Sequence, residues 1–159
     1  RNLFPELSVR HNLEFGGITM KDPNMLEERI EGILDRFPVL RKRADQQAST
    51  LSGGEQKLLE LGRGLLLDPL LMLIDEPSIG LAPLIVRQVF DELIQLRDSG
   101  VSVMMVEQNA RSALAISDDA LVLEQGRLAL AGPANEVLDN PSIGELFLGG
   151  TLAGDDTPA

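Results

Sequence analysis

Two adjacent carboxylates, Asp75 and Glu76, follow directly after the apolar run of residues 70–74. A strand over this run would deliver both side chains at its carboxyl end, where ligands bind in parallel sheets. One carboxylate can hold Mg²⁺ through water, and its neighbour can polarise an attacking water molecule. The alternative is that the pair only begins a surface loop. The glycine-containing segment upstream favours the catalytic interpretation.

That segment is Ser52-Gly53-Gly54-Glu55. Ser52 with Glu55 three residues later predicts a capping box at the start of a helix. Capping does not explain two glycines in the first turn, since a glycine in a helix lowers stability by roughly 1 kcal/mol. Glycines there let a phosphate approach the bare amides and the positive end of the helix dipole. The segment therefore predicts a clamp for a terminal phosphate group.

Alternating elements must position these residues. Apolar strands, helical periodicity and turn residues predict helices at 52–67, 83–99 and 109–116 and strands at 70–74, 101–106, 120–123 and 127–130, the last two joined by a turn at Gln125-Gly126. Two short helices are expected at 135–138 and 142–147. Strands that alternate with helices and are apolar throughout indicate an α/β protein with a parallel sheet covered on both faces.

The first sixty residues differ from this alternating part, because they are predicted to be helical. Residues 7–13 start a short helix that Gly16-Gly17 ends, and a second helix at 25–37 is stopped by Pro38. The basic cluster at residues 41–43 is typical of a solvated turn. The small, polar tail at 151–159 is expected to be disordered.

Composition narrows the range of partners. The net charge of −11 would repel phosphate backbones, and five Phe with no Trp or Tyr leave few platforms for stacking bases, so nucleic acid is not expected as a partner. Disulfides and thiolate metal sites are excluded because the chain has no Cys. No apolar run approaches the roughly 20 residues of a membrane span.

The two motifs in sequence resemble the ABC ATPase family. Residues 51–55, Leu-Ser-Gly-Gly-Glu, look like its signature, residues 70–77 like its Walker B, and residues 78–81 like its D-loop. The likeness covers nearly all of residues 2–150. It implies the fold of a P-loop NTPase: a parallel sheet flanked by helices, plus a helical signature subdomain. Residues 1–64 would form that subdomain, and residues 65–150 the second half of the RecA-like nucleotide-binding core.

The resemblance also implies roles for single residues, with ATP and Mg²⁺ as cofactors. Asp75 would be the magnesium ligand and Glu76 the catalytic base. The γ-phosphate of ATP held by a second ATPase subunit would be clamped by the segment Ser52, Gly53, Gly54 and Glu55, so a working site needs two subunits head to tail. The D-loop that crosses this dimer would be formed by Ser78, Gly80 and Leu81.

Two positions depart from the family pattern. The D-loop usually continues with Asp, where this chain has Ala82-Pro83, and the switch position usually carries His, where this chain has Gln108. Glutamine can orient a water molecule and hydrogen-bond a phosphate, as it does in some GTPases, but it cannot become a cation. We therefore include Gln108 with the catalytic residues. The sole histidine, His11, is interpreted as a surface residue.

These departures resemble one subgroup, the ATPase subunits of branched-chain amino-acid importers, which also share the closing Leu148-Gly149-Gly150. Such a subunit works with transmembrane permease subunits, peripherally on the cytoplasmic face of the membrane. Related importers of urea or amides share the glutamine and remain an alternative. A non-transport ABC protein would predict heptad segments, a second cassette or basic patches, and the sequence has none of these.

The chain opens at Arg1 and contains no Gly-x₄-Gly-Lys-Ser/Thr, since its only lysines, Lys21, Lys42 and Lys57, lack that context. The Walker A and the Q-loop glutamine are therefore expected upstream of residue 1. These 159 residues alone are expected not to hydrolyse ATP.

Overall fold

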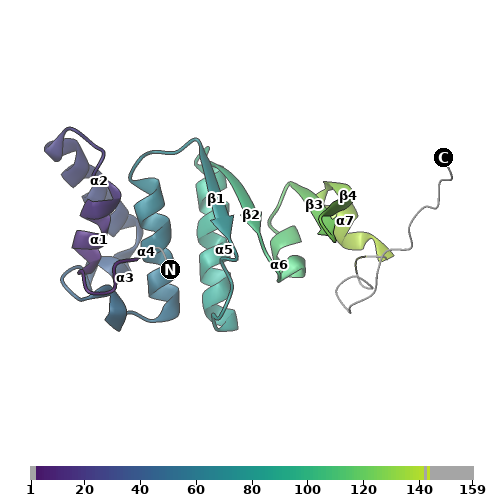
Figure 1. Cartoon of the computed structure of the whole chain (residues 1–159), viewed down its shortest axis with the longest axis horizontal. Coiled ribbons are helices and arrows are strands. Elements are labelled where there is room, and N and C mark those ends of the chain that lie inside the picture. The colour runs from purple at the N-terminus through teal and green to yellow at the C-terminus, as the bar shows by residue number, and fades with distance from the viewer. Residues whose placement is uncertain (1–2, 142, 144–159) are drawn as a thin grey trace. The chain divides into compact units, whose positions relative to one another are not determined.

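A computed structural model describes residues 3–141 and 143. The expected tail at 151–159 and most of the expected helix at 142–147 lie outside the described residues. The chain forms two compact units, residues 1–107 and 108–159, which are described separately below (Figure 1). The division that the resemblance implies at residue 64 is a different one and stays a prediction.

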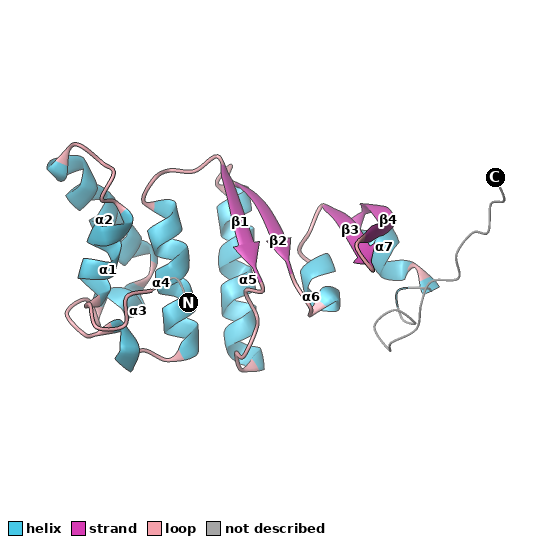
Figure 2. Ribbon diagram, viewed as in Figure 1, coloured by secondary structure: helices cyan, strands magenta, loops and turns pink. Residues whose placement is uncertain are grey.

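The first part of unit 1 is helical, as predicted (Figure 2). Its elements are α1 (Val9–Gly16), α2 (Pro23–Arg36), α3 (Pro38–Arg41), the 3₁₀-helix η1 (Ala48–Thr50) and α4 (Gly53–Leu65). Their apolar faces meet in one core, whose fully buried members include Leu13, Ile30, Leu34, Phe37 and Leu59. These residues recur at helical spacing, which is why one face of each helix is buried.

Capping residues set the helix starts. The Ser8 hydroxyl accepts a hydrogen bond from the His11 N–H, so α1 begins at Val9, two residues later than predicted. Asp22 caps α2 in the same way, ahead of Pro23. Pro38 ends α2 but also opens the short helix α3, which the sequence did not predict, since proline suits a first helical position. His11 is exposed, which confirms its surface interpretation.

Ion pairs tie α1, α2 and α3 together. Glu31 accepts hydrogen bonds from both Arg10 and Arg41, and Arg41 also donates to Asp35 at 2.8 Å. The hydrogen bonds from Arg41 and then Arg10 hold the pKa of the Glu31 carboxyl below its ordinary value. The basic cluster at 41–43 is thus not only a solvated turn, because Arg41 belongs to α3 and pairs with α2.

Replacing Glu31 by Gln is expected to lower the urea midpoint of unfolding at neutral pH. Because the folded pKa of Glu31 lies below its unfolded value, its contribution is present above the unfolded pKa and is lost as pH falls through the folded pKa. The difference from wild type should therefore vanish in acid. Glu28, exposed on the same helix, supplies the control Glu28→Gln. A midpoint difference that is constant with pH would contradict the pairing.

The second part of unit 1 contains β1 (Leu71–Asp75), α5 (Pro83–Asp98) and β2 (Ser102–Val106). The two strands are parallel, with Leu71 beside Ser102 and Asp75 beside Val106. This confirms the predicted strand–helix–strand unit. Pro83 occupies the first position of α5, and Gly100, at a φ of 96°, follows its end.

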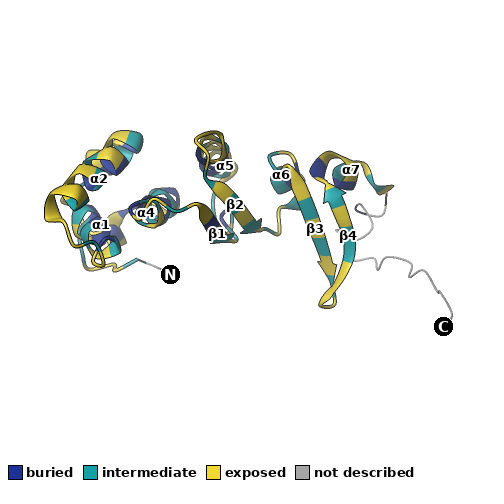
Figure 3. Cartoon of the chain, turned by 90° about the horizontal axis from the view of Figure 1, so that it is seen from above, coloured by how far each residue is buried: buried dark blue, intermediate teal, exposed yellow. Residues whose placement is uncertain are grey.

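One face of this strand pair is open, contrary to the expectation that helices cover both faces. Met72 is 9% exposed, whereas Leu71, Leu73, Met104 and Val106 on the opposite face are 52%, 72%, 55% and 62% exposed (Figure 3). Their apolar sequence is typical of strands that are buried on both faces. In the described part of the chain, however, no helix or strand covers this exposed face.

Unit 2 contains α6 (Ala110–Leu114), β3 (Asp119–Glu124), β4 (Arg127–Pro133) and α7 (Ala134–Asp139). β3 and β4 are antiparallel and joined by the predicted turn at Gln125-Gly126, so the parallel arrangement does not extend to them. Only an antiparallel pair can be joined by so short a turn. The unit has its own small core, formed by Leu114, Ala134, Val137 and Ile143. In neither unit does a described helix have the length and apolar character of a membrane span.

Candidate functional site

Two of the predicted segments meet at one end of unit 1. In Figure 1, β1 points toward the lower edge, where the loop that follows it enters α5 and where α4 begins. Leu81 of this loop lies next to Gly53 of α4, since a Cβ built on Gly53 would come within 3.2 Å of the Leu81 side chain. Folding therefore brings the predicted signature and D-loop together within one chain.

The start of α4 is a capping box, as predicted. The Ser52 N–H donates to Glu55 Oε2 at 2.8 Å, and the Glu55 N–H donates to the Ser52 hydroxyl at 3.4 Å. Arg43, which the sequence did not place here, pairs with Glu55 Oε1 at 2.9 Å. Both oxygens of Glu55 thus have partners in the chain, and its carboxylate fixes the helix start.

The capping box leaves two amides at this helix start. The N–H groups of Gly53 and Gly54 belong to the first turn of α4, where no intrahelical acceptor exists. They lie at the positive end of a helix of 13 residues. A phosphate oxygen bound there would accept hydrogen bonds from backbone N–H groups alone. Such a site suits a phosphate whatever group the phosphate is attached to.

The two glycines have a packing role that the sequence did not reveal. A Cβ on Gly54 would lie 2.2 Å from Cγ2 of Ile85, a distance that no real contact allows. Gly54 is buried, so α4 approaches α5 closely because this position has no side chain. Phosphate access is therefore not the only reason for glycine in the motif.

The carboxyl end of β1 presents the predicted acidic pair. Asp75 is exposed, and Glu76 is partly buried. The Glu76 N–H donates to the Val106 carbonyl at 2.8 Å, which extends the strand pairing by one bond. Glu76 has a φ of 42°, a conformation that L-residues rarely adopt. Such backbone strain clusters at functional sites.

The loop after Glu76 is held by a residue that the sequence analysis missed. Glu107, the first residue after β2, accepts hydrogen bonds from the Ser78 N–H at 3.0 Å and from the Ser78 hydroxyl at 2.6 Å. Pro77 is fully buried, and Gly80 turns the chain with a φ of 71°. The pattern that pointed to Asp75, an acidic residue at the end of an apolar strand, also applies to Glu107.

Gln108 is the first residue of unit 2, whereas every other predicted site residue lies in unit 1. It is exposed, and its carbonyl accepts a hydrogen bond from the Ala110 N–H at 2.8 Å as the chain enters α6. The structure thus brings the loop after β1 against the start of α4, through Leu81 and Gly53, and it describes Gln108 only within its own unit.

The donor set at the end of β1 suits Mg²⁺ in the presence of phosphate. No cluster of three or more metal-binding side chains occurs among residues 3–141 and 143. Mg²⁺ does not need such a cluster, because it keeps several waters and is bound by one or two carboxylates plus phosphate oxygens. An exposed carboxylate such as that of Asp75 fits this requirement.

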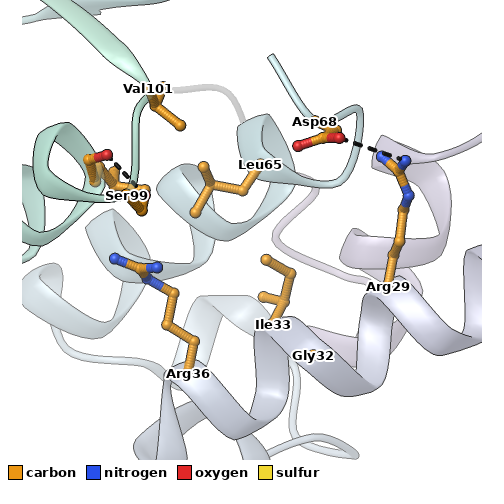
Figure 4. Close-up of a pocket in the computed structure, with 9 residues that line it drawn as sticks. Arg29, Gly32, Ile33, Arg36, Leu65, Asp68, Ser99 and Val101 are labelled. Atoms are coloured by element: carbon orange, nitrogen blue, oxygen red, sulfur yellow. Dashed lines mark hydrogen bonds and ion pairs between the residues drawn. The ribbon is translucent and has the colours of Figure 1, made fainter. Parts of the chain in front are cut away.

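A pocket of about 440 Å³ lies elsewhere in unit 1, where α2 meets the carboxyl ends of α4 and α5 (Figure 4). It contains two guanidinium groups, but each is balanced: Arg29 pairs with Asp68 and donates to the Leu66 carbonyl at 2.7 Å, and Arg36 pairs with Glu92 at 3.4 Å. None of the predicted site residues lines this pocket, so it is separate from the candidate site.

Known proteins resemble this chain in sequence. The profile of the ABC transporter family matches residues 1–79. The chain is 44% identical over 150 residues to BraG of Pseudomonas aeruginosa, a high-affinity branched-chain amino acid transport ATP-binding protein, covering 94% of this chain and 64% of BraG. It is 38% identical over 149 residues to LivF of Archaeoglobus fulgidus, a probable branched-chain amino acid transport ATP-binding protein, covering 93% of this chain and 63% of LivF.

Solved structures resemble its fold. The ADP conformation of an ATP-binding cassette from an ABC transporter superposes with a TM-score of 0.79 at 28% identity, covering 91% of this chain and 64% of the cassette. The chain thus spans somewhat less than two thirds of the length of each of these proteins.

Proposed function

The chain belongs to the ABC transporter family and has the fold of its ATP-binding cassettes, and from this premise we propose that it forms part of an ATPase subunit that drives a branched-chain amino-acid importer. The observation that carries the ATPase is the placement of Asp75 and Glu76 at the carboxyl end of β1, a strand that points toward the side of unit 1 where α4 begins. We also propose that residues 1–64 act as the helical subdomain and residues 65–150 as half of the nucleotide-binding core.

Hydrolysis would divide the acidic pair between two tasks. Asp75, exposed and last in β1, would bind Mg²⁺, which when present neutralises charge on the phosphates. Glu76 would accept a proton from the attacking water as general base. The hydrogen bond from the Glu76 N–H to the Val106 carbonyl holds its backbone, and this restricts where its carboxylate can lie. Gln108 would orient a water molecule or hydrogen-bond a phosphate.

The start of α4 would bind the γ-phosphate of a nucleotide carried by a second ATPase subunit. Ser52, Gly53 and Gly54 would contact the phosphate, and Glu55 would keep the helix start in place through its capping and Arg43 contacts. The loop with Ser78, Gly80 and Leu81 would cross to the partner. A head-to-tail dimer follows from these roles, since each subunit supplies half of each site.

The transporter would also contain transmembrane permease subunits, with this subunit attached peripherally at the cytoplasmic face. The substrate proposal is supported by the relatives of Pseudomonas aeruginosa and Archaeoglobus fulgidus, whose names specify branched-chain amino acids. Such a subunit would contact only nucleotide and permease and not the transported molecule. The substrate therefore has to be tested in cells.

Deleting the gene is expected to impair uptake of labelled leucine, isoleucine or valine, because transport without its ATPase has no energy source. Uptake is measured in the deletion strain, in the same strain complemented with wild type, and in one complemented with Glu76→Gln. Only the wild-type gene should restore uptake. Unchanged uptake of all three amino acids together with reduced uptake of urea or short amides would assign the subunit to the related importers instead.

A further inference from the structure

The loop that follows Glu76 is held by a carboxylate from the neighbouring strand end. Glu107 takes both donors of Ser78, the N–H at 3.0 Å and the hydroxyl at 2.6 Å, one on each carboxylate oxygen. The shorter distance is typical of a charge-assisted O–H···O⁻ bond. A residue 29 positions away in sequence thus fixes both the backbone and the side chain of Ser78.

This contact lies next to a strained residue. Glu76 precedes Ser78 by two positions and has a φ of 42°. Its own N–H donates a hydrogen bond to the Val106 carbonyl at 2.8 Å. The chain after it is held by Pro77, which is buried, and by the hydrogen bonds that Glu107 accepts from Ser78. A strained conformation persists only where its surroundings hold it. The last residue of β2, Val106, and the residue after it, Glu107, therefore together restrain the backbone at Glu76.

The same loop reaches the phosphate-binding helix start. Its last residue, Leu81, packs where a side chain of Gly53 would stand, and the Leu81 N–H donates to the Ser78 carbonyl at 3.2 Å. Ser78 therefore lies between Glu76, two residues before it, and Leu81, which contacts the start of α4. Its position affects both halves of the site.

We propose that Glu107 is a positioning residue for ATP hydrolysis, which acts through Ser78 to hold Glu76 and the loop at residues 78–81 in their working geometry. The proposal rests on the proposed function and adds a residue to it. Glu107 itself contacts neither nucleotide nor water in this role. It would change the rate of the chemical step rather than the affinity for ATP.

The test uses the full-length ATPase with its partner subunits and the variants Glu107→Gln, Ser78→Ala and Ser78→Thr. A glutamine amide keeps the shape of Glu107 but can accept only one of the two hydrogen bonds. Since hydrogen bonds to charged groups are the strong ones, we expect Glu107→Gln to lower kcat by roughly 10- to 100-fold with KM for ATP unchanged. Ser78→Ala should lower kcat less, because its N–H still donates.

Ser78→Thr keeps the hydroxyl and should retain most of the activity that Ser78→Ala loses. The double variant Glu107→Gln/Ser78→Ala should lose less than the sum of the two single losses in activation free energy, because both changes act on the same pair of residues. A Glu107→Gln protein with wild-type kcat, or a loss that appears in KM alone, would overturn the proposal. If Glu107→Gln does not fold, equal activity of the Ala and Thr variants of Ser78 would overturn it.

Glu76→Gln, measured in parallel, separates this inference from the function itself. If Glu76→Gln is inactive and Glu107→Gln is normal, the ATPase proposal stands and only the positioning role is wrong. If Glu76→Gln retains full turnover, the proposed function fails before the role of Glu107 arises.

Discussion

Replacing Glu76 by Gln is expected to lower ATP turnover by roughly 10²–10⁴-fold, the usual effect of removing a well-placed general base. Glutamine has nearly the same shape, and the Glu76 N–H that donates to Val106 belongs to the backbone, so the loop should keep its position. ATP binding should therefore be retained. If hydrolysis opens the proposed dimer, the variant should also accumulate as an ATP-bound dimer.

Turnover, nucleotide binding and sedimentation with ATP and Mg²⁺ test the three parts of this expectation in the full-length protein. Glu28→Gln on the exposed face of α2 removes the same charge at a distance from the motifs and should behave like wild type. A Glu76→Gln protein that stays monomeric with saturating ATP would count against the dimer, and one with normal turnover would remove Glu76 from the catalytic role.

Local patterns in the sequence predicted the elements well, because each depends on residues close together in the chain. Buried Ile30, Ile33 and Leu34 recur at helical spacing in α2, and the capping box of Ser52 and Glu55 spans one helical turn. The errors at helix ends are also local. Ser8 caps α1 at a later residue than expected, and Pro38 opens a helix as well as ending one.

Contacts between distant residues could not be predicted in the same way. Glu107 and Ser78 are 29 residues apart, and nothing near either residue in sequence specifies the pairing. Arg43 pairs with Glu55 through the packing of the helical core, although its neighbours suggested a solvated turn. The apolar pattern of β1 and β2 predicted their strands correctly, but it does not specify which segment covers each face, and one face is exposed among the described residues.

Gly54 combines two constraints that the motif alone does not separate. A Cβ at this position would lie 2.2 Å from Cγ2 of Ile85 and 3.4 Å from its Cβ. Since Ile is branched at Cβ and stiff about χ1, Cγ2 cannot easily swing away, and α4 would have to move from α5. Overpacking of this kind typically costs about 1–3 kcal/mol, more than the roughly 1 kcal/mol that replacing a helical glycine by alanine contributes. Any side chain here should destabilise the fold.

Gly54→Asp is therefore expected to abolish ATPase activity and also to lower the melting temperature. A carboxylate this close to the proposed phosphate-binding amides would repel the anion, and its Cβ would displace Ile85. Ile85→Ala removes Cγ2 and separates the two effects. In an Ile85→Ala background, the further substitution Gly54→Asp should cost little additional stability, measured by thermal unfolding, yet turnover should still be lost. Gly54→Ala in the same background is the uncharged control. If Gly54→Asp/Ile85→Ala hydrolysed ATP as fast as Ile85→Ala, the glycine would serve packing alone, and the phosphate-binding role of this helix start would be wrong.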